Sequence, residues 1–119
     1  MKKVWYLSTC DTSRRIIREF DLKGRGFDMQ DIKKEPVTPD QLELMKELAG
    51  SYEAVFSRLA RKYKALGLKD KKLGEADYRD LILSDYTFLK RPVIIIDNQL
   101  FAGSQEKTLA ALQEALQAF

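Results

Sequence analysis

The residues best suited to chemistry lie in one short stretch near the start of the chain. Cys10, the only cysteine among the 119 residues, follows an apolar and aromatic segment at 4–7 and precedes a predicted helix. The peptide dipoles of a helix give its N-terminus a partial positive charge, and its first N–H groups are free to face a sulfur atom. Both effects favour the thiolate, which is the nucleophilic form of cysteine. We therefore expect Cys10 to be a catalytic thiol rather than a buried apolar side chain.

Residues that follow Cys10 are expected to assist it. Ser13 lies three positions further on, on the same face of the predicted helix, where its hydroxyl can donate to the thiolate. Thr12 and Arg14 are candidate anion-binding residues, although Thr12 fits a helix cap better than a ligand. Asp11 acts in the opposite direction, because a neighbouring carboxylate raises the pKa of a thiol. We expect the arginines and the positive helix end to lower the pKa of Cys10 by more than Asp11 raises it.

The composition excludes several mechanisms. The chain has no histidine and one cysteine, so it has no Ser-His-Asp or Cys-His pair, no Cys/His zinc site and no internal disulfide. The net charge of +3, from 21 basic and 18 acidic residues, suits an anionic ligand without requiring nucleic acid. No apolar run approaches the roughly 20 residues that span a bilayer. We expect a cytoplasmic monomer with no bound cofactor or metal.

The elements that position Cys10 follow from the pattern of apolar residues. A strand over 3–7, a helix from about 11 to 22 and a strand over 27–32 predict a βαβ unit, in which the two strands are parallel. Cys10 then lies at the carboxyl end of the first strand, where ligands bind in open α/β sheets. Gly24 is a candidate left-handed cap after this helix.

Residues from about 36 to 89 are predicted to form a helical insertion in a single domain whose core is about 1–35 and 90–119. Thr38 and Pro39 begin one helix, Ser51 caps a second that extends to Leu59, and residues 75–84 form a third. The segment 58–64 is basic. It fits equally a solvated helix face or a source of one arginine, Arg58, that turns into the Cys10 site.

The C-terminal part predicts the remainder of the sheet. Residues 91–97 form an apolar run typical of a central strand buried on both faces, and a turn at 98–99 leads into an antiparallel strand. Ser104 is the predicted N-cap of a last helix with a buried stripe of Leu109, Leu112, Leu116 and Phe119. The resulting order predicts an α/β thioredoxin-like (glutaredoxin-type) β-α-β…β-β-α core with a mixed four-stranded sheet and an inserted helical subdomain.

Three motifs in this order resemble the arsenate reductase (ArsC) family of the thioredoxin fold, which also includes the Spx-type transcriptional regulators. They are CDTSR at 10–14, YKALGL at 63–68 and LKRPV at 89–93, and the resemblance covers essentially the whole chain. In glutathione- and glutaredoxin-coupled members the cysteine attacks arsenate, three arginines hold the oxyanion, and the proline before the third strand is cis.

The resemblance carries over to this chain position by position. Cys10 matches the nucleophile, Arg91 and Pro92 match an anion-binding arginine and the cis-proline, and Arg58 matches the arginine of the insertion, with Arg61 as the alternative register. The chain departs from the reductases at 102–103, where Ala-Gly replaces the third arginine, and before the cysteine, where it has no histidine. Ser13 replaces the second cysteine of the Spx-type switch.

The resemblance therefore implies a thiol reductase-like protein with one nucleophilic cysteine. Glutathione or a glutaredoxin would act as the external reductant and partner, and arsenate activity is expected to be weak or absent. The alternative is a non-catalytic, Spx-like regulatory or protein-binding module, which contacts RNA polymerase or another protein through its basic segment.

Overall fold

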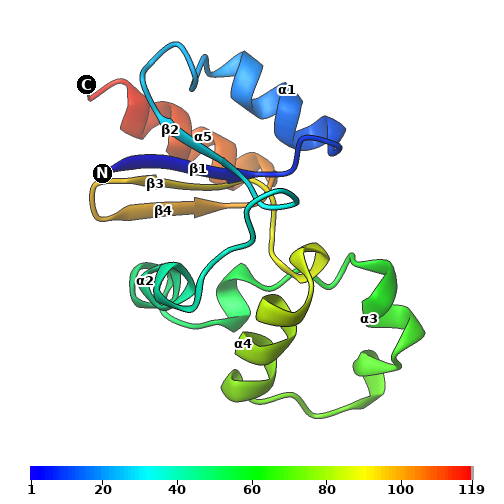
Figure 1. Ribbon diagram of the computed structural model, residues 1–119. Coiled ribbons are helices and arrows are strands. Elements are labelled where there is room, and N and C mark those ends of the chain that lie inside the picture. Colours follow the sequence, from blue (N-terminus) through cyan, green and yellow to red (C-terminus); the bar gives the residue numbers. More distant parts are fainter. Residues whose placement is uncertain (119) are drawn as a thin grey trace. The chain divides into compact units, whose positions relative to one another are not determined.

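A computed structural model describes residues 1–118, which form two compact units. The first unit contains Met1–Glu35 together with the described residues from Arg91 onward, and the second contains Pro36–Lys90 (Figure 1). The Phe119 predicted for the last apolar stripe lies outside the described residues. No helix in residues 1–118 is long and apolar enough to cross a membrane.

A mixed four-stranded sheet forms the centre of the first unit, with the strand order β2-β1-β3-β4. Its strands are β1 (Lys2–Tyr6), β2 (Asp28–Asp31), β3 (Val93–Ile96) and β4 (Gln99–Ala102). The strands β1 and β2 are parallel because a helix connects them, whereas β3 is antiparallel to both β1 and β4. The α/β fold class predicted from the sequence is confirmed.

Two helices, α1 (Asp11–Glu19) and α5 (Glu106–Leu116), lie on the same side of this sheet (Figure 1). Their apolar residues Ile16 and Leu112 share one buried cluster with Val4 of β1 and Ile94 of β3. All four residues of β3 are buried, as predicted for a central strand. This core fixes α1 on the sheet, and with α1 the loop that carries Cys10.

The end of α1 differs from the prediction. The helix ends at Glu19, and Asp21 then takes a positive φ of 50°, which aspartate tolerates better than most residues. The predicted left-handed cap at Gly24 is wrong, since the left-handed glycine of this loop is Gly26, with φ 85°. Gly24 lies against the Asp21 carboxylate, which would have to move to make room for a Cβ at residue 24.

Two further predicted boundaries are also wrong by one residue. The turn between β3 and β4 is formed by residues 97–98, because Gln99 already pairs with Ile96 in the sheet, and Asp97 supplies the positive φ of 54°. The N-cap of α5 is Gln105 rather than Ser104, and its side chain makes no capping hydrogen bond.

The second unit consists of three helices and three short 3-10 turns. The helices are α2 (Pro39–Ala49), α3 (Arg61–Ala65) and α4 (Glu75–Ser84), and the turns are η1 (Glu53–Val55), η2 (Leu68–Asp70) and η3 (Tyr86–Phe88). The predicted start of α2 is confirmed, since Thr38 and Gln41 form a reciprocal capping box with both hydrogen bonds at 3.1 Å. The predicted helix over 75–84 is also confirmed.

The helix predicted after Ser51 is only the 3-10 turn η1. Ser51 caps it as expected, because its Oγ accepts a hydrogen bond from the Ala54 N–H at 3.1 Å. The chain then leaves the turn and pairs with the segment that precedes residue 91. Ser57 donates from its backbone to Phe88 at 2.7 Å, and Lys90 donates to Val55 at 2.9 Å. Leu59, placed in this helix by the prediction, is instead 93% exposed.

Candidate active site

Cys10 is the N-cap residue of α1, at the predicted junction of strand and helix. Its backbone is extended (φ −100°, ψ 114°), its N–H donates to the Leu7 carbonyl at 3.0 Å, and its carbonyl accepts from the Arg14 N–H at 3.1 Å. The first N–H groups of a helix have no partner in an earlier turn. The half-buried Cys10 thiol therefore lies at the positive end of the α1 dipole.

The surroundings of this thiol lower its pKa from the ordinary value of 9.0. Burial alone would raise the pKa, because it disfavours the charged form. The N–H and hydroxyl of Ser13, the positive charge of Arg91 and the N–H of Thr12 together outweigh the effect of burial. Cys10 is thus thiolate to a greater extent at neutral pH than an unperturbed cysteine.

Ser13 is fully buried, in spite of its polar side chain. Its hydroxyl makes no hydrogen bond of standard geometry to any described residue, yet it lies close enough to the Cys10 sulfur to lower the pKa of that thiol. A buried hydroxyl without a partner costs stability, typically about 1–3 kcal/mol. This arrangement supports the interpretation that Ser13 serves the sulfur or what binds there.

The pairing of β1 with β3 places Arg91 and Pro92 at the end of the sheet that carries Cys10. The Arg91–Pro92 peptide bond is cis, as the family resemblance implied. In the antiparallel pairing of β1 with β3, Val93 lies opposite Trp5, so the residues before β3 and the residues after β1 lie at the same end of the sheet. This register explains why the charge of Arg91 acts on the Cys10 thiol.

Thr12 and Arg14 contribute differently from each other. Thr12 acts on the sulfur through its backbone N–H, which lowers the pKa of Cys10. Arg14 forms an ion pair with Asp11 on the exposed surface of α1. The negative charge that was expected to oppose Cys10 ionisation therefore has a cationic partner of its own.

Asp31, at the end of β2, is a residue that the sequence analysis did not single out. It is 9% exposed, and its Oδ1 accepts hydrogen bonds from the backbone N–H groups of Ser8, at 3.4 Å, and Lys33, at 3.2 Å. Burial raises its pKa, but the bonds from Ser8 and Lys33 and the charge of Lys34 lower it overall. Asp31 thus ties the loop that leads to Cys10 to the neighbouring strand. Its position at the carboxyl end of a parallel strand was the available signal.

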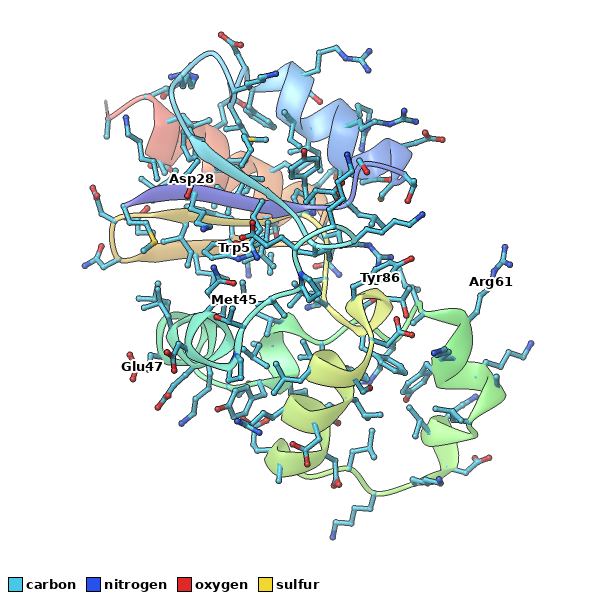
Figure 2. The ribbon with its side chains drawn as sticks, viewed as in Figure 1. Trp5, Asp28, Met45, Glu47, Arg61 and Tyr86 are labelled. Carbon is cyan, nitrogen blue, oxygen red and sulfur yellow. The ribbon has the colours of Figure 1, made fainter. Side chains whose placement is uncertain are left out.

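Arg58 lies in the second unit, where its contacts are with that unit's own residues. Its Nη2 donates to Glu53 Oε2 at 2.5 Å and to the Tyr78 hydroxyl at 3.1 Å, and its guanidinium lies 5.7 Å from the centre of the Tyr78 ring. The bond to Glu53 raises the pKa of Arg58. Arg61, the alternative, is exposed and extends away from α3 (Figure 2). Anion binding by Arg58 stays a prediction.

No group of three or more histidine, cysteine, aspartate or glutamate side chains in residues 1–118 is arranged to hold a metal ion. A thiolate at a helix start, beside a hydroxyl and an arginine, can attack an electrophilic sulfur or an oxyanion.

Comparison with solved structures shows the class of fold. The chain superposes on a possible arsenate reductase from Streptococcus mutans UA159 with a TM-score of 0.74, at 28% identity, covering 95% of this chain and 98% of that chain. An arsenate reductase from Vibrio cholerae gives 0.71 at 18% identity, with 95% of each chain covered. An ArsC-related protein from Brucella melitensis gives 0.71 at 21% identity, covering 95% of this chain and 94% of that one.

This likeness defines an α/β protein of the thioredoxin-like class. In this chain, Cys10 lies at the start of the first helix. The model of the ArsC family matches residues 5–112, which is most of the chain. The protein therefore belongs to the ArsC family. A search of curated protein sequences found no match.

Proposed function

We propose that this protein is a thiol reductase with one nucleophilic cysteine, Cys10, and an external thiol as its reductant. The observation that carries the proposal is the lowered pKa of the Cys10 thiol at the start of α1, with contributions from Ser13 and Arg91. A structural cysteine in an apolar core would have the opposite shift. Membership of the ArsC family supports the same chemistry.

The reaction with glutathione needs no second cysteine. The Cys10 thiolate attacks the glutathionyl sulfur of a mixed disulfide, forms a bond to that sulfur and releases the other thiol as a thiolate. A thiolate of free glutathione, or of a glutaredoxin, then attacks the same glutathionyl sulfur. Cys10 leaves as a thiolate, and the electrons of the external thiols have reduced the substrate disulfide. Arg91 would hold the carboxylates of glutathione, because its planar guanidinium donates paired hydrogen bonds.

Arsenate is the second substrate class that family membership supports. The Cys10 thiolate would attack arsenic, form a sulfur–arsenic bond and release one arsenate oxygen as water. Two external thiols would then be oxidised to a disulfide, which reduces arsenic from As(V) to As(III) and frees Cys10 as the sulfur–arsenic bond breaks. Arg91 is the candidate ligand of the oxyanion beside Cys10, and a role for Arg58 stays a prediction of the family resemblance. Ala102-Gly103 replaces the third arginine of the reductases. We therefore expect arsenate turnover with glutathione and glutaredoxin to be weak or absent.

The test of the proposal is formation of a mixed disulfide. Wild-type protein is incubated with oxidised glutathione, and its intact mass is measured before and after addition of glutathione and glutaredoxin. The expected result is one glutathione per chain, which is absent from the Cys10→Ser variant and is removed by the reductants. An unmodified wild-type protein after prolonged incubation at neutral pH would contradict the proposal.

A protein-binding module is the second candidate, favoured by one observation in the second unit. Leu59 is 93% and Leu66 51% exposed, on either side of the basic helix α3. Exposed apolar residues among cations are typical of a surface that meets an acidic partner. Binding to purified RNA polymerase would support this function if Cys10→Ala retains it and Leu59→Ser with Arg61→Ala loses it. If all these variants bound RNA polymerase equally, or if the wild-type protein did not bind it, α3 would not be the surface that binds this partner.

A further inference from the structure

A groove that does not include Cys10 lies along α1 in the first unit. It has a volume of about 430 Å³ and is open on one side. Cys10, Ser13 and Arg91 are all absent from its lining. Its volume falls in the range of roughly 300–1,000 Å³ that is typical of small-molecule sites.

The floor of the groove is apolar. Tyr6 of β1, Ile17 of α1 and Met29 of β2 line it, and each packs against the buried core of the unit while remaining partly exposed. The side chains that remain partly uncovered there come from three different elements. The hydrocarbon part of a ligand bound there would remove this partly exposed apolar surface from water.

The rim of the groove is mainly cationic. Arg14, Arg18 and Lys23 line it together with one carboxylate, that of Asp21. Arg14 is paired with Asp11, whereas Arg18 and Lys23 make no side-chain ion pair with a residue in the described part of the chain. Asp21 supplies one negative charge against three positive ones, so the lining of the groove keeps a net positive charge.

Unpaired cations are common on protein surfaces, and apolar side chains are often partly exposed. Their combination in one concave site is what indicates a ligand. Two cations that make no ion pair with a described residue border a floor of three apolar side chains. A ligand that matches both the cationic rim and the apolar floor has a negative group joined to a hydrocarbon part. A small anion alone would stay hydrated, and an uncharged hydrocarbon would leave the cations unpaired.

We propose that this groove binds a small organic acid. Its carboxylate pairs with Arg18 and Lys23, and its hydrocarbon body lies on Tyr6, Ile17 and Met29. This site is additional to the thiol chemistry proposed above and uses none of its residues. It therefore remains in a Cys10→Ser variant, with the same affinity.

The test uses octanoate as the anionic probe and 1-octanol as the uncharged probe of the same chain length. Amide shifts followed by NMR during an octanoate titration are expected to move at Ile17, Arg18 and Met29 and to stay unchanged along α5. Calorimetry is expected to give tighter binding of octanoate than of 1-octanol, and weaker binding of octanoate at high salt.

A pair of double variants with the same change in charge supplies the control. Arg18→Gln/Lys23→Gln is expected to weaken octanoate binding by roughly tenfold, the loss of about one charge-assisted hydrogen bond. Arg15→Gln/Lys107→Gln, at exposed positions outside the groove, is expected to leave it unchanged.

Three results would overturn the proposal. They are equal binding of octanol and octanoate by the wild-type protein, shifts that map to another surface, and equal weakening in both double variants. Binding of an acidic peptide in the groove without binding of octanoate would assign it to a protein partner instead. The comparison of the two probes on wild-type protein needs no variant, so it stands even if a substitution disturbs folding.

Discussion

Arg91 lowers the pKa of Cys10 although the entire second unit separates the two residues in the sequence. The antiparallel register of β1 and β3 accounts for this relationship, because it pairs Trp5 with Val93 and so aligns the end of one strand with the start of the other. The sheet of the first unit thus brings a positive charge close to the Cys10 thiol in a chain that has no histidine.

Removal of the Arg91 charge is expected to make Cys10 less reactive. In Arg91→Gln the pKa of the thiol rises, and alkylation by iodoacetamide at pH 7 slows by roughly two- to fivefold, the range for one exposed charge pair. Stopped samples analysed by mass spectrometry give the rate. Arg15→Gln is the matched control, because Arg15 is exposed on α1 and does not act on the thiol. Identical rates for the Arg91 variant and wild type would remove Arg91 from the site.

Replacement of Ser13 is expected to change the reactivity of Cys10 with little effect on the stability of the fold. Ser13→Ala raises the pKa of Cys10 and slows its alkylation, because a donor near the sulfur is lost. The free energy of unfolding in urea falls by less than about 0.5 kcal/mol or increases, since the deleted hydroxyl is buried and makes no hydrogen bond of standard geometry.

Ser57→Ala provides the contrast for that prediction. Ser57 is also buried, but its Oγ accepts a hydrogen bond from the Leu59 N–H at 3.3 Å. Its replacement is expected to cost about 1 kcal/mol and to leave Cys10 reactivity unchanged. If Ser13→Ala destabilised the protein and left the thiol pKa unaltered, Ser13 would be an ordinary core residue.

Asp31 is expected to act on Cys10 through the loop that it holds. Asp31→Ala leaves the N–H groups of Ser8 and Lys33 without their acceptor, at a cost of roughly 1–3 kcal/mol in unfolding free energy. Amide exchange at Ser8 and Lys33 speeds up, and the pH midpoint of Cys10 alkylation shifts. Asp31→Asn keeps the acceptor oxygen and is expected to restore slow exchange. Fast exchange in both variants would argue against this hydrogen-bonding role.

Asp85 is expected to make the protein sensitive to acid. Burial raises its pKa, but the bond from Lys62, at 2.6 Å, and those from Thr87 lower it from 3.8 to about 2. The resulting stabilisation is full above pH 3.8 and is lost as the pH falls towards 2, because the carboxylate then becomes protonated in both folded and unfolded states. Its size is about 2 kcal/mol.

The measurement for Asp85 is urea unfolding of wild type and Asp85→Asn across this range of pH. The variant is expected to be less stable at pH 6 and to approach wild type near pH 2. Asp80→Asn, at an exposed position on α4, should show little difference at either pH. A gap between wild type and the Asp85 variant that does not depend on pH would assign the effect to packing.

The features that the sequence predicted well depend on local chemistry. The β-branched apolar run at 93–96 favours a buried strand, and Thr38-Pro39 carries both the cap and the rigid first residue of a helix. Cys10 was identifiable for the same reason, because a strand and a helix on its two sides define the helix start. The parallel pairing of β1 with β2 followed from the helix between them.

The features that could not be predicted from the sequence depend on which of several similar, neighbouring residues takes a given conformation or makes a given contact. Gly24 and Gly26 are equally able to take positive φ. Because α1 ends early, at Glu19, the residue of this loop that takes it is Gly26 rather than Gly24. The Arg58–Glu53 pair was not foreseen, since a basic segment carries no sign of which carboxylate its side chains meet. Asp31 was missed because its role depends on the register of β2 against β1.

The pH dependence of Cys10 alkylation in the wild-type protein measures whether the fold activates this thiol. The rate is measured in the folded state and again in urea, where the same thiol serves as its own reference. The midpoint in the folded protein is expected below 9.0 and below that of the unfolded chain. A folded midpoint equal to or above the unfolded one would contradict the assignment of Cys10 as an activated nucleophile.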